Sequence, residues 1–125
     1  METIPVSLAF EDERGTITDL LNNVEIRHVG ILTSRAGAIR GNHYHKKASQ
    51  YSYVIKGRLE VVSQTPGQQP ESETVSQGDM FLDLPGTSHA MRFLDDTELL
   101  VLTTVPRDEG GYEDDTVRLK KPLIS

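Results

Sequence analysis

Residues 37–57 read GAIRGNHYHKKASQYSYVIKG, and this stretch decides the fold. Residues two apart on a β-strand point to the same face of the sheet. The side chains of His43 and His45 are therefore expected side by side, with Tyr44 on the opposite face. Two imidazoles on one face of a barrel are well placed to bind one divalent metal ion.

The second half of the stretch predicts a hairpin. Residues 51–62 alternate between two faces and are interrupted by Gly57, which is typical of a half-buried strand, a tight turn and a returning strand. On this pattern Tyr51 and Tyr53 are expected on the face that turns toward the core. Leu59 and Val61 are expected on the core face of the returning strand.

The rest of the chain shows similar short runs of β-branched and apolar residues between Gly, Pro and Asp turns. Strands are expected at residues 4–10, 16–21, 24–33, 38–45, 80–84, 89–94 and 97–105, with an edge strand around 117–119. The acidic stretch 108–115 is expected to be solvated. Helical periodicity is absent, so the chain is predicted to be all-β, a sandwich or barrel that forms a single domain over residues 1–125.

Composition excludes several classes of function. The chain has 125 residues, four histidines, no cysteine and a net charge of −6. Without cysteine there are no disulfides, thiolate metal sites or thiol nucleophiles. A net negative domain is a poor candidate for nucleic-acid binding. No apolar run is long enough to span a membrane, and residues 1–10 have no basic residue ahead of their apolar positions, as a secretory signal would. The expected location is therefore the cytoplasm.

A third histidine extends the candidate site. His89 follows the turn Pro85-Gly86-Thr87-Ser88 and begins a later strand, so it can supply a third nitrogen beside His43 and His45. Three neutral nitrogens leave open positions for water or substrate, as catalytic metals require. His28 is expected to be a surface or edge-strand histidine outside this group.

Two segments resemble the sequence motifs of the cupin family. Residues 37–57 are similar to G-x5-H-x-H-x4-E-x6-G, with Gln50 in place of the glutamate. Residues 78–93 are similar to G-x5-P-x-G-x2-H-x3-N, with the proline displaced to Pro85 and Phe93 in place of the asparagine. The resemblance implies a cupin jelly-roll β-barrel, also called a double-stranded β-helix.

The resemblance also implies a metal site. In metal-binding cupins the residues that match His43, His45, Gln50 and His89 hold one divalent ion of Fe, Mn, Ni, Zn or Cu. The neutral amide of Gln50 offers oxygen without charge, so weaker retention or a preference for softer late metals is expected. The alternative is a histidine pocket that holds no metal.

A second resemblance favours that alternative. Residues 40–43 resemble the R-G-x-H signature of nucleotide-sugar 3,5-epimerases and 3,4-ketoisomerases, and residues 40–47, RGNHYHKK, are similar to the R-G-x-H-x-H-K-K stretch of the ketoisomerases. The resemblance implies an enzyme that needs no metal. The resemblance implies His43 as general base, His45 as second acid or base, and Arg40 as the group that orients a phosphate or an enolate oxygen.

The main expectation is a cupin with a metal-competent three-histidine pocket that acts on or binds a sugar or another small carbonyl compound. Such a protein is expected to be an enzyme, either an isomerase or epimerase or a metal-dependent enzyme that acts on a small molecule. The alternatives are a metal-independent nucleotide-sugar ketoisomerase or epimerase and a non-catalytic sugar-binding or sensory cupin. A homodimer that pairs through edge strands is expected, with a small-molecule ligand and neither nucleic acid nor membrane as partner.

Overall fold

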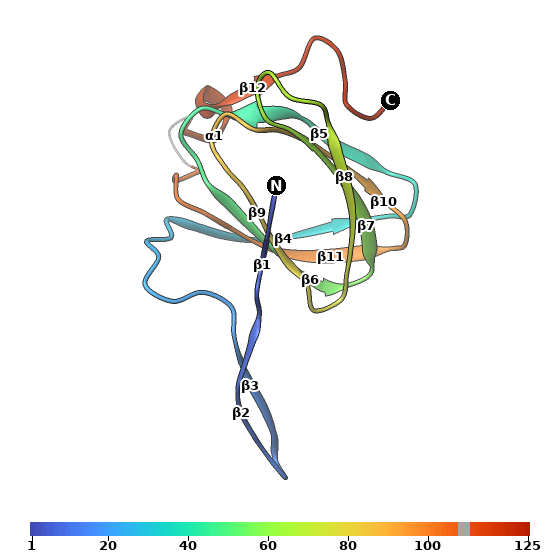
Figure 1. Cartoon of the computed structure of the whole chain (residues 1–125). Coiled ribbons are helices and arrows are strands. Elements are labelled where there is room, and N and C mark those ends of the chain that lie inside the picture. The colour runs from blue at the N-terminus through green and yellow to red at the C-terminus, as the bar shows by residue number, and fades with distance from the viewer. Residues whose placement is uncertain (108–110) are drawn as a thin grey trace.

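The computed structural model describes residues 1–107 and 111–125, and Figure 1 shows two β-sheets packed face to face in a jelly roll. The first sheet has the order β1-β9-β6-β11-β4. Its strands are β1 (Glu2–Ile4), β9 (Met80–Asp83), β6 (Gln50–Lys56), β11 (Thr97–Thr103) and β4 (His28–Ser34). The second sheet has the order β12-β5-β10-β7-β8. Its strands are β12 (Thr116–Arg118), β5 (Ile39–His45), β10 (Ser88–Phe93), β7 (Arg58–Gln64) and β8 (Glu71–Ser76).

All the described strand pairs are antiparallel, and the predicted all-β jelly roll is confirmed. The expected edge strand near 117–119 is β12, which pairs with β5. The run 4–10 is divided at Pro5 into β1 and β2 (Ser7–Asp12), because proline cannot donate to a ladder. β8 was not expected, because its polar residues lack an apolar alternation. The five-residue helix α1 (Gly111–Asp115) was also not expected.

Burial along β6 corrects the expected orientation of the tyrosines. Gln50, Ser52 and Val54 are buried and face the barrel interior, whereas Tyr51 and Tyr53 are half-buried on the outer face. The prediction was wrong because the alternation separates two faces without saying which one turns inward. The outer face of this sheet is also apolar, so hydrophobicity did not identify the interior.

The chain turns from β6 into β7 at Gly57. This residue has a φ of +98°, and a Cβ there would clash with the backbone of Asp96 and the side chain of Thr97. Only glycine fits a left-handed position against a neighbouring chain segment. The predicted hairpin is nevertheless wrong, because β6 pairs with β9 and β11 whereas β7 pairs with β8 and β10. Gly57 carries the chain from one sheet to the other, and β7 buries Leu59 and Val61 as expected.

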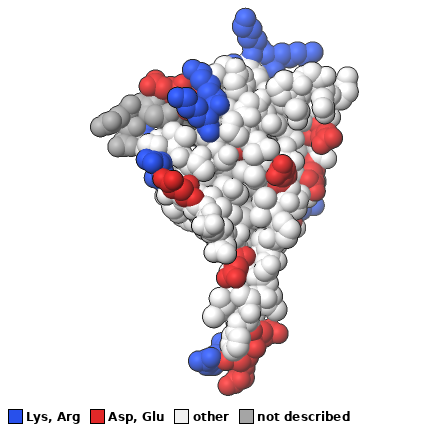
Figure 2. Space-filling view, turned by 60° about the vertical axis from the view of Figure 1, so that its left-hand side comes forward, with Lys and Arg blue, Asp and Glu red and all other residues white. Residues whose placement is uncertain are grey.

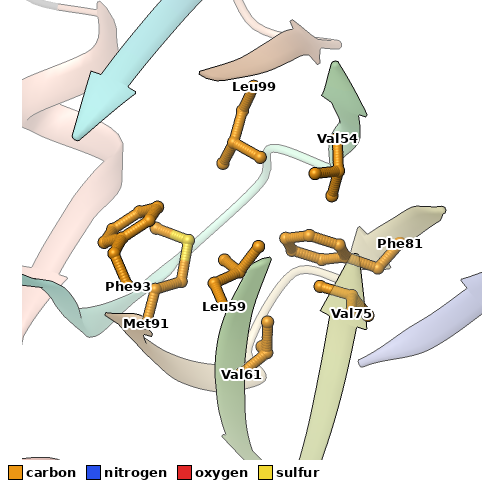
Figure 3. Close-up of a cluster of buried hydrophobic side chains, with 8 residues drawn as sticks. All are labelled: Val54, Leu59, Val61, Val75, Phe81, Met91, Phe93 and Leu99. Carbon is orange, nitrogen blue, oxygen red and sulfur yellow. The ribbon is translucent and has the colours of Figure 1, made fainter. Parts of the chain in front are cut away.

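The interior of the barrel has an apolar layer and a polar layer. Figure 3 shows the apolar layer, in which side chains from both sheets converge. Its members are Val54, Leu59, Val61, Val75, Phe81, Met91, Phe93 and Leu99. Burial of each large side chain stabilises the fold by about 1.5–3 kcal/mol. The polar layer continues along the same inward faces and consists of His43, His45, Gln50, Ser52, Asp83 and His89.

A two-stranded hairpin projects from the barrel. It is formed by β2 and β3 (Gly15–Asp19), which pair with each other and extend away from both sheets (Figure 1). Leu8, Phe10 and Ile17 on this hairpin are at least half exposed. Figure 2 shows charged side chains concentrated at the hairpin tip and a stem with few charges.

Two further expectations concern the last part of the chain and membranes. In the acidic stretch 108–115, Asp108 and Glu109 lie outside the described residues. Asp115 is buried, which contradicts the expectation that this stretch is solvated.

Among the described residues, no helix is both long and apolar enough to cross a membrane.

Candidate functional site

Three histidines meet in the polar layer, as their spacing predicts. His43 on β5 lies directly opposite His89 on β10, and His45 follows two residues later on the same face of β5. The ring centroid of His43 lies 4.7 Å from that of His89 and 4.9 Å from that of His45. Only 7%, 2% and 1% of the surfaces of His43, His45 and His89 are exposed.

The electrostatic environment keeps His43 and His45 neutral. Burial, followed by the nearby charge of His89, lowers the pKa of His43 to about 3. The same two causes lower the pKa of His45 to about 4, against the weaker opposing influence of Asp115. At neutral pH both imidazoles are therefore unprotonated, and each has a nitrogen lone pair for a proton or a metal ion.

The fourth expected ligand, Gln50, also reaches the site. It is buried on β6, and it lines the same cavity as His43 and His89. His45 is not among the residues that line this cavity, so it lies behind the other two rings. Its Nδ1 lies 3.4 Å from Thr116 Oγ1 and 3.8 Å from Asp115 Oδ2.

Two buried carboxylates that the sequence analysis did not single out accompany the histidines. Asp83 Oδ1 lies 4.0 Å from His89 Nδ1, and burial raises the pKa of Asp83. Neither oxygen of Asp83 has a hydrogen-bond partner among the described residues. Asp115 accepts hydrogen bonds from the backbone amides of Lys47 (2.7 Å) and Ala48 (3.1 Å), which fixes the chain just after β5. Asp83 had a sequence signal, because it interrupts an apolar strand at an inward position.

The cavity beside the histidines opens between β4 and the β5–β12 edge. Its volume is about 490 Å³, within the range of about 300–1,000 Å³ that is common for small-molecule sites. Among the residues that the structure describes, three arginines line it, Arg40, Arg107 and Arg118, against one carboxylate, Glu113. The net positive lining suits an anionic ligand.

Of these arginines, the sequence analysis predicted only Arg40. Its guanidinium donates to Ser34 Oγ (3.2 Å) and to the backbone oxygen of Thr33 (3.1 Å), so it also links β5 to β4. Arg118 reaches the cavity because β12 pairs with β5 and places it opposite His43. His28, expected outside the site, lies on the edge strand β4 as predicted but is half-buried and lines the cavity.

The three histidines are chemically suitable ligands for a divalent metal, but their nitrogens are too far apart to share one ion in this arrangement. One nitrogen from each of the three histidines lies within 4.8 Å of the others. Ligand nitrogens around one tetrahedral zinc ion lie about 3.3 Å apart, given bonds of about 2.0 Å. The rings would have to turn inward by small rotations to share an ion. Within the described chain, His43 Nδ1 and both ring nitrogens of His89 have no hydrogen-bond partner, so these atoms are available as ligands.

Comparisons with known proteins agree with this geometry. A family model described as Cupin matches residues 18–117. A comparison with curated proteins finds no match. Many solved structures share the fold.

Three similar structures are isomerases or epimerases by name. A 3,4-ketoisomerase from Helicobacter canadensis has a TM-score of 0.73 at 22% identity, over 91% of this chain and 89% of that one. A mutant of the 3,4-ketoisomerase QdtA from Thermoanaerobacterium thermosaccharolyticum, in complex with TDP-4-keto-6-deoxyglucose, has a TM-score of 0.70 at 21% identity, over 90% and 86%. The rmlC epimerase of Mycobacterium tuberculosis has a TM-score of 0.71 at 18% identity, over 87% and 65%.

Proposed function

This chain belongs to the cupin family. We propose that it is a nucleotide-sugar isomerase, which moves a ketone between neighbouring carbons of the sugar in a nucleoside-diphosphate sugar. The main observation behind the proposal is that His43, whose imidazole is neutral, lines the same cavity as three arginines. These are Arg40, Arg107 and Arg118. A proton acceptor beside cationic groups suits a substrate with an acidic C–H bond and a diphosphate. The proposal favours the metal-independent alternative of the sequence analysis over its metal-dependent main expectation.

The arginines are the proposed site of the diphosphate. A guanidinium donates paired hydrogen bonds to phosphate oxygens, and three of them offset the charge of a diphosphate. Arg118 lies opposite His43 in the β5–β12 pair, so a diphosphate held there would leave the sugar close to the imidazole. Among the similar structures, a QdtA mutant binds a TDP-linked keto sugar, which supports this class of ligand.

The proposed chemistry is a proton transfer next to the sugar ketone. His43 removes the proton from C3 of a 4-keto sugar, and the electron pair of that bond forms the C3=C4 bond of an enediolate with its charge on the former ketone oxygen. The C4 oxygen takes up the proton that the C3 hydroxyl loses, and the protonated imidazole returns its proton to C4 as the C3=C4 electrons form the new C4–H bond, so the ketone moves to C3 and C4 carries a hydroxyl. Arg40 is proposed to stabilise the enediolate oxygen, and His45, 4.9 Å from His43 between ring centroids, to relay the proton.

The low pKa of His43 is compatible with this role. A base with a pKa of about 3 is always unprotonated at neutral pH, but it holds a proton weakly. A bound diphosphate brings negative charge into the cavity, and an opposite charge nearby favours a protonated imidazole. Substrate binding therefore raises the pKa of His43 toward the range in which a general base is effective.

The second candidate is a metal-dependent reaction on the same class of substrate. Its supporting observation is the set of three buried histidines with nitrogens within 4.8 Å of one another. His43, His45, His89 and Gln50 are the proposed ligands. A bound Fe, Mn, Ni, Zn or Cu ion would supply Lewis-acid polarisation of the carbonyl oxygen.

One experiment separates these candidates. The protein, stripped of metal with EDTA, is incubated in D₂O with TDP-4-keto-6-deoxyglucose, and proton NMR follows deuterium at C3 and C4 and the appearance of the 3-keto isomer. Isomerisation without metal supports the proposal, and activity only after Zn²⁺ or Mn²⁺ is added supports the second candidate. Tight binding without exchange supports a sugar-binding protein. Absence of both binding and exchange with TDP- and UDP-linked keto sugars contradicts the proposed substrate class.

We also propose that residues 1–125 form one domain that assembles as a homodimer. On the outer face of the first sheet, Leu100 and Leu102 on β11 lie in register with apolar neighbours on both sides. Those neighbours are Tyr51, Tyr53, Val29 and Ile31. The exposed apolar side chains of the β2–β3 hairpin offer a matching surface to a second copy. A two-fold axis would allow each copy to cover the sheet face of the other.

A further inference from the structure

Asn42 lies on β5 between Arg40 and His43, which both carry proposed roles, and its backbone is unusual. Its φ is +57°, in the left-handed region that few residues other than glycine adopt. The neighbouring Gly41 has a φ of +90°. In the ladder with β10, Gly41 is opposite Ala90 and His43 is opposite His89, and the register shifts between them. Asn42 therefore has no partner on β10 and forms a β-bulge.

The bulge determines which side chains reach the cavity. Arg40 and His43 are three residues apart, and on a regular strand an odd separation places side chains on opposite faces. The extra residue in the bulge shifts the alternation by one position, so Arg40 and His43 point to the same face. Arg40 lies opposite Met91 and His43 lies opposite His89, both partners are buried, and all four residues line the same cavity.

The side chain of Asn42 ties the bulge to the segment that follows β12. Its Oδ1 accepts hydrogen bonds from the amides of Leu123 (2.8 Å) and Ile124 (3.2 Å), and its Nδ2 donates to the carbonyl of Ile124 (2.9 Å). The backbone carbonyl of Asn42 accepts from the amide of Leu119 (2.9 Å). The bulge is thus held by four hydrogen bonds from residues about 80 positions away.

We propose that Asn42 is a positioning residue: its amide side chain locks the β5 bulge to residues 123–124 and so keeps the Arg40 guanidinium and the His43 imidazole on one side of the strand. The inference deepens the proposed function and rests on it for its kinetic readout. Asn42 borders the cavity, but its side-chain amide is engaged by residues 123–124. The inference therefore gives the segment after β12 a part in forming the site.

The test compares variants that separate the hydrogen bonds from the backbone conformation. Asn42→Gly keeps the left-handed φ at little cost and removes the three side-chain hydrogen bonds. Asn42→Ala removes them and also strains the backbone. Ile124→Ala is the matched control, because it loses buried apolar surface in the same segment while the backbone groups that bind Asn42 remain.

Two readouts are measured on each EDTA-treated variant. The first is kcat and KM for isomerisation of TDP-4-keto-6-deoxyglucose. The second is the imidazole ¹H–¹⁵N NMR spectrum, in which the His43 signal is assigned by its loss in His43→Asn. The spectrum requires no turnover, so it tests the inference even if the substrate class is wrong.

The parent protein should have the highest kcat, Asn42→Gly a lower one and Asn42→Ala the lowest. A misplacement of about 1 Å costs up to about 100-fold in rate, so a loss of about 10- to 100-fold is expected for Asn42→Gly with a smaller change in KM. The His43 signal should shift in both Asn42 variants and stay in place in Ile124→Ala. A parent-like His43 signal in Asn42→Gly, or equal effects in Asn42→Gly and Ile124→Ala, would overturn the inference.

Discussion

Acidification should destabilise the protein through the buried histidines. In the unfolded chain a histidine has a pKa of about 6.5, whereas in the folded protein the pKa values of His43 and His45 are about 3 and about 4. Between these limits the unfolded state binds more protons than the folded state. The free energy of unfolding therefore falls as the pH falls below about 6.5, and the loss levels off as the pH passes through 4 and 3.

The size of the effect follows from the two shifts. Linkage between pH 7 and pH 5 gives a loss of about 1.9 kcal/mol for each histidine, or up to about 4 kcal/mol for the pair. Both side chains are more than nine-tenths buried, so solvent does little to reduce this cost. Total stabilities of domains are about 5–15 kcal/mol, and the predicted loss is a large part of that range. The raised pKa of Asp83 works in the opposite direction, because a folded state that binds this proton more tightly gains stability as the pH falls.

The comparison that isolates the histidines uses the double variant His43→Asn/His45→Asn, whose amides do not titrate. Urea unfolding of both proteins is followed by circular dichroism at pH 7, 6 and 5 in the presence of EDTA. The parent should lose up to about 4 kcal/mol more than the variant between pH 7 and 5. Asp83 is present in both proteins, so its contribution cancels in the difference. Equal losses in the two proteins would refute the assignment of buried, neutral imidazoles.

Four further outcomes are expected. His43→Ala should lower kcat about 10²- to 10⁴-fold, with TDP affinity by calorimetry nearly unchanged, and retained turnover would exclude His43 as the base. Arg118→Ala should weaken TDP binding about 10- to 100-fold, whereas Lys120→Ala, which lies outside the cavity lining, should not. Phe10→Ser on the exposed hairpin should reduce the dimer fraction in light scattering, and an unchanged mass would contradict the proposed interface. His89→Ala should lower the Zn²⁺ content after loading and dialysis if the second candidate is correct, and an unchanged content would exclude His89 as a ligand.

The local pattern of the chain was enough to predict an all-β domain and the centre of its site, whereas the jelly-roll barrel was implied by the resemblance to cupins. Alternation with a period of two and turn glycines such as Gly57 are properties of short segments, so they can be read without long-range information. The two-residue spacing of His43 and His45 fixed their common face for the same reason. His89 was expected beside them because it begins a later strand after the turn at residues 85–88, and the structure places it opposite His43.

Other parts of the site could not be predicted because they depend on contacts between distant segments. Arg118 and Asp115 approach the histidines only because β12 pairs with β5, about 70 residues earlier in the chain. The orientation of Tyr51 was wrong because alternation does not say which face turns inward.

The sequence by itself therefore determined an all-β chain with His43 and His45 on one face of a strand. The tertiary structure alone decided that Arg40 shares that face, because the bulge at Asn42 changes the parity of β5 and is held by residues 123–124. Local periodicity is set by the geometry of one strand. A bulge is stabilised by hydrogen bonds to a segment that only folding brings near, and no local pattern records that partner.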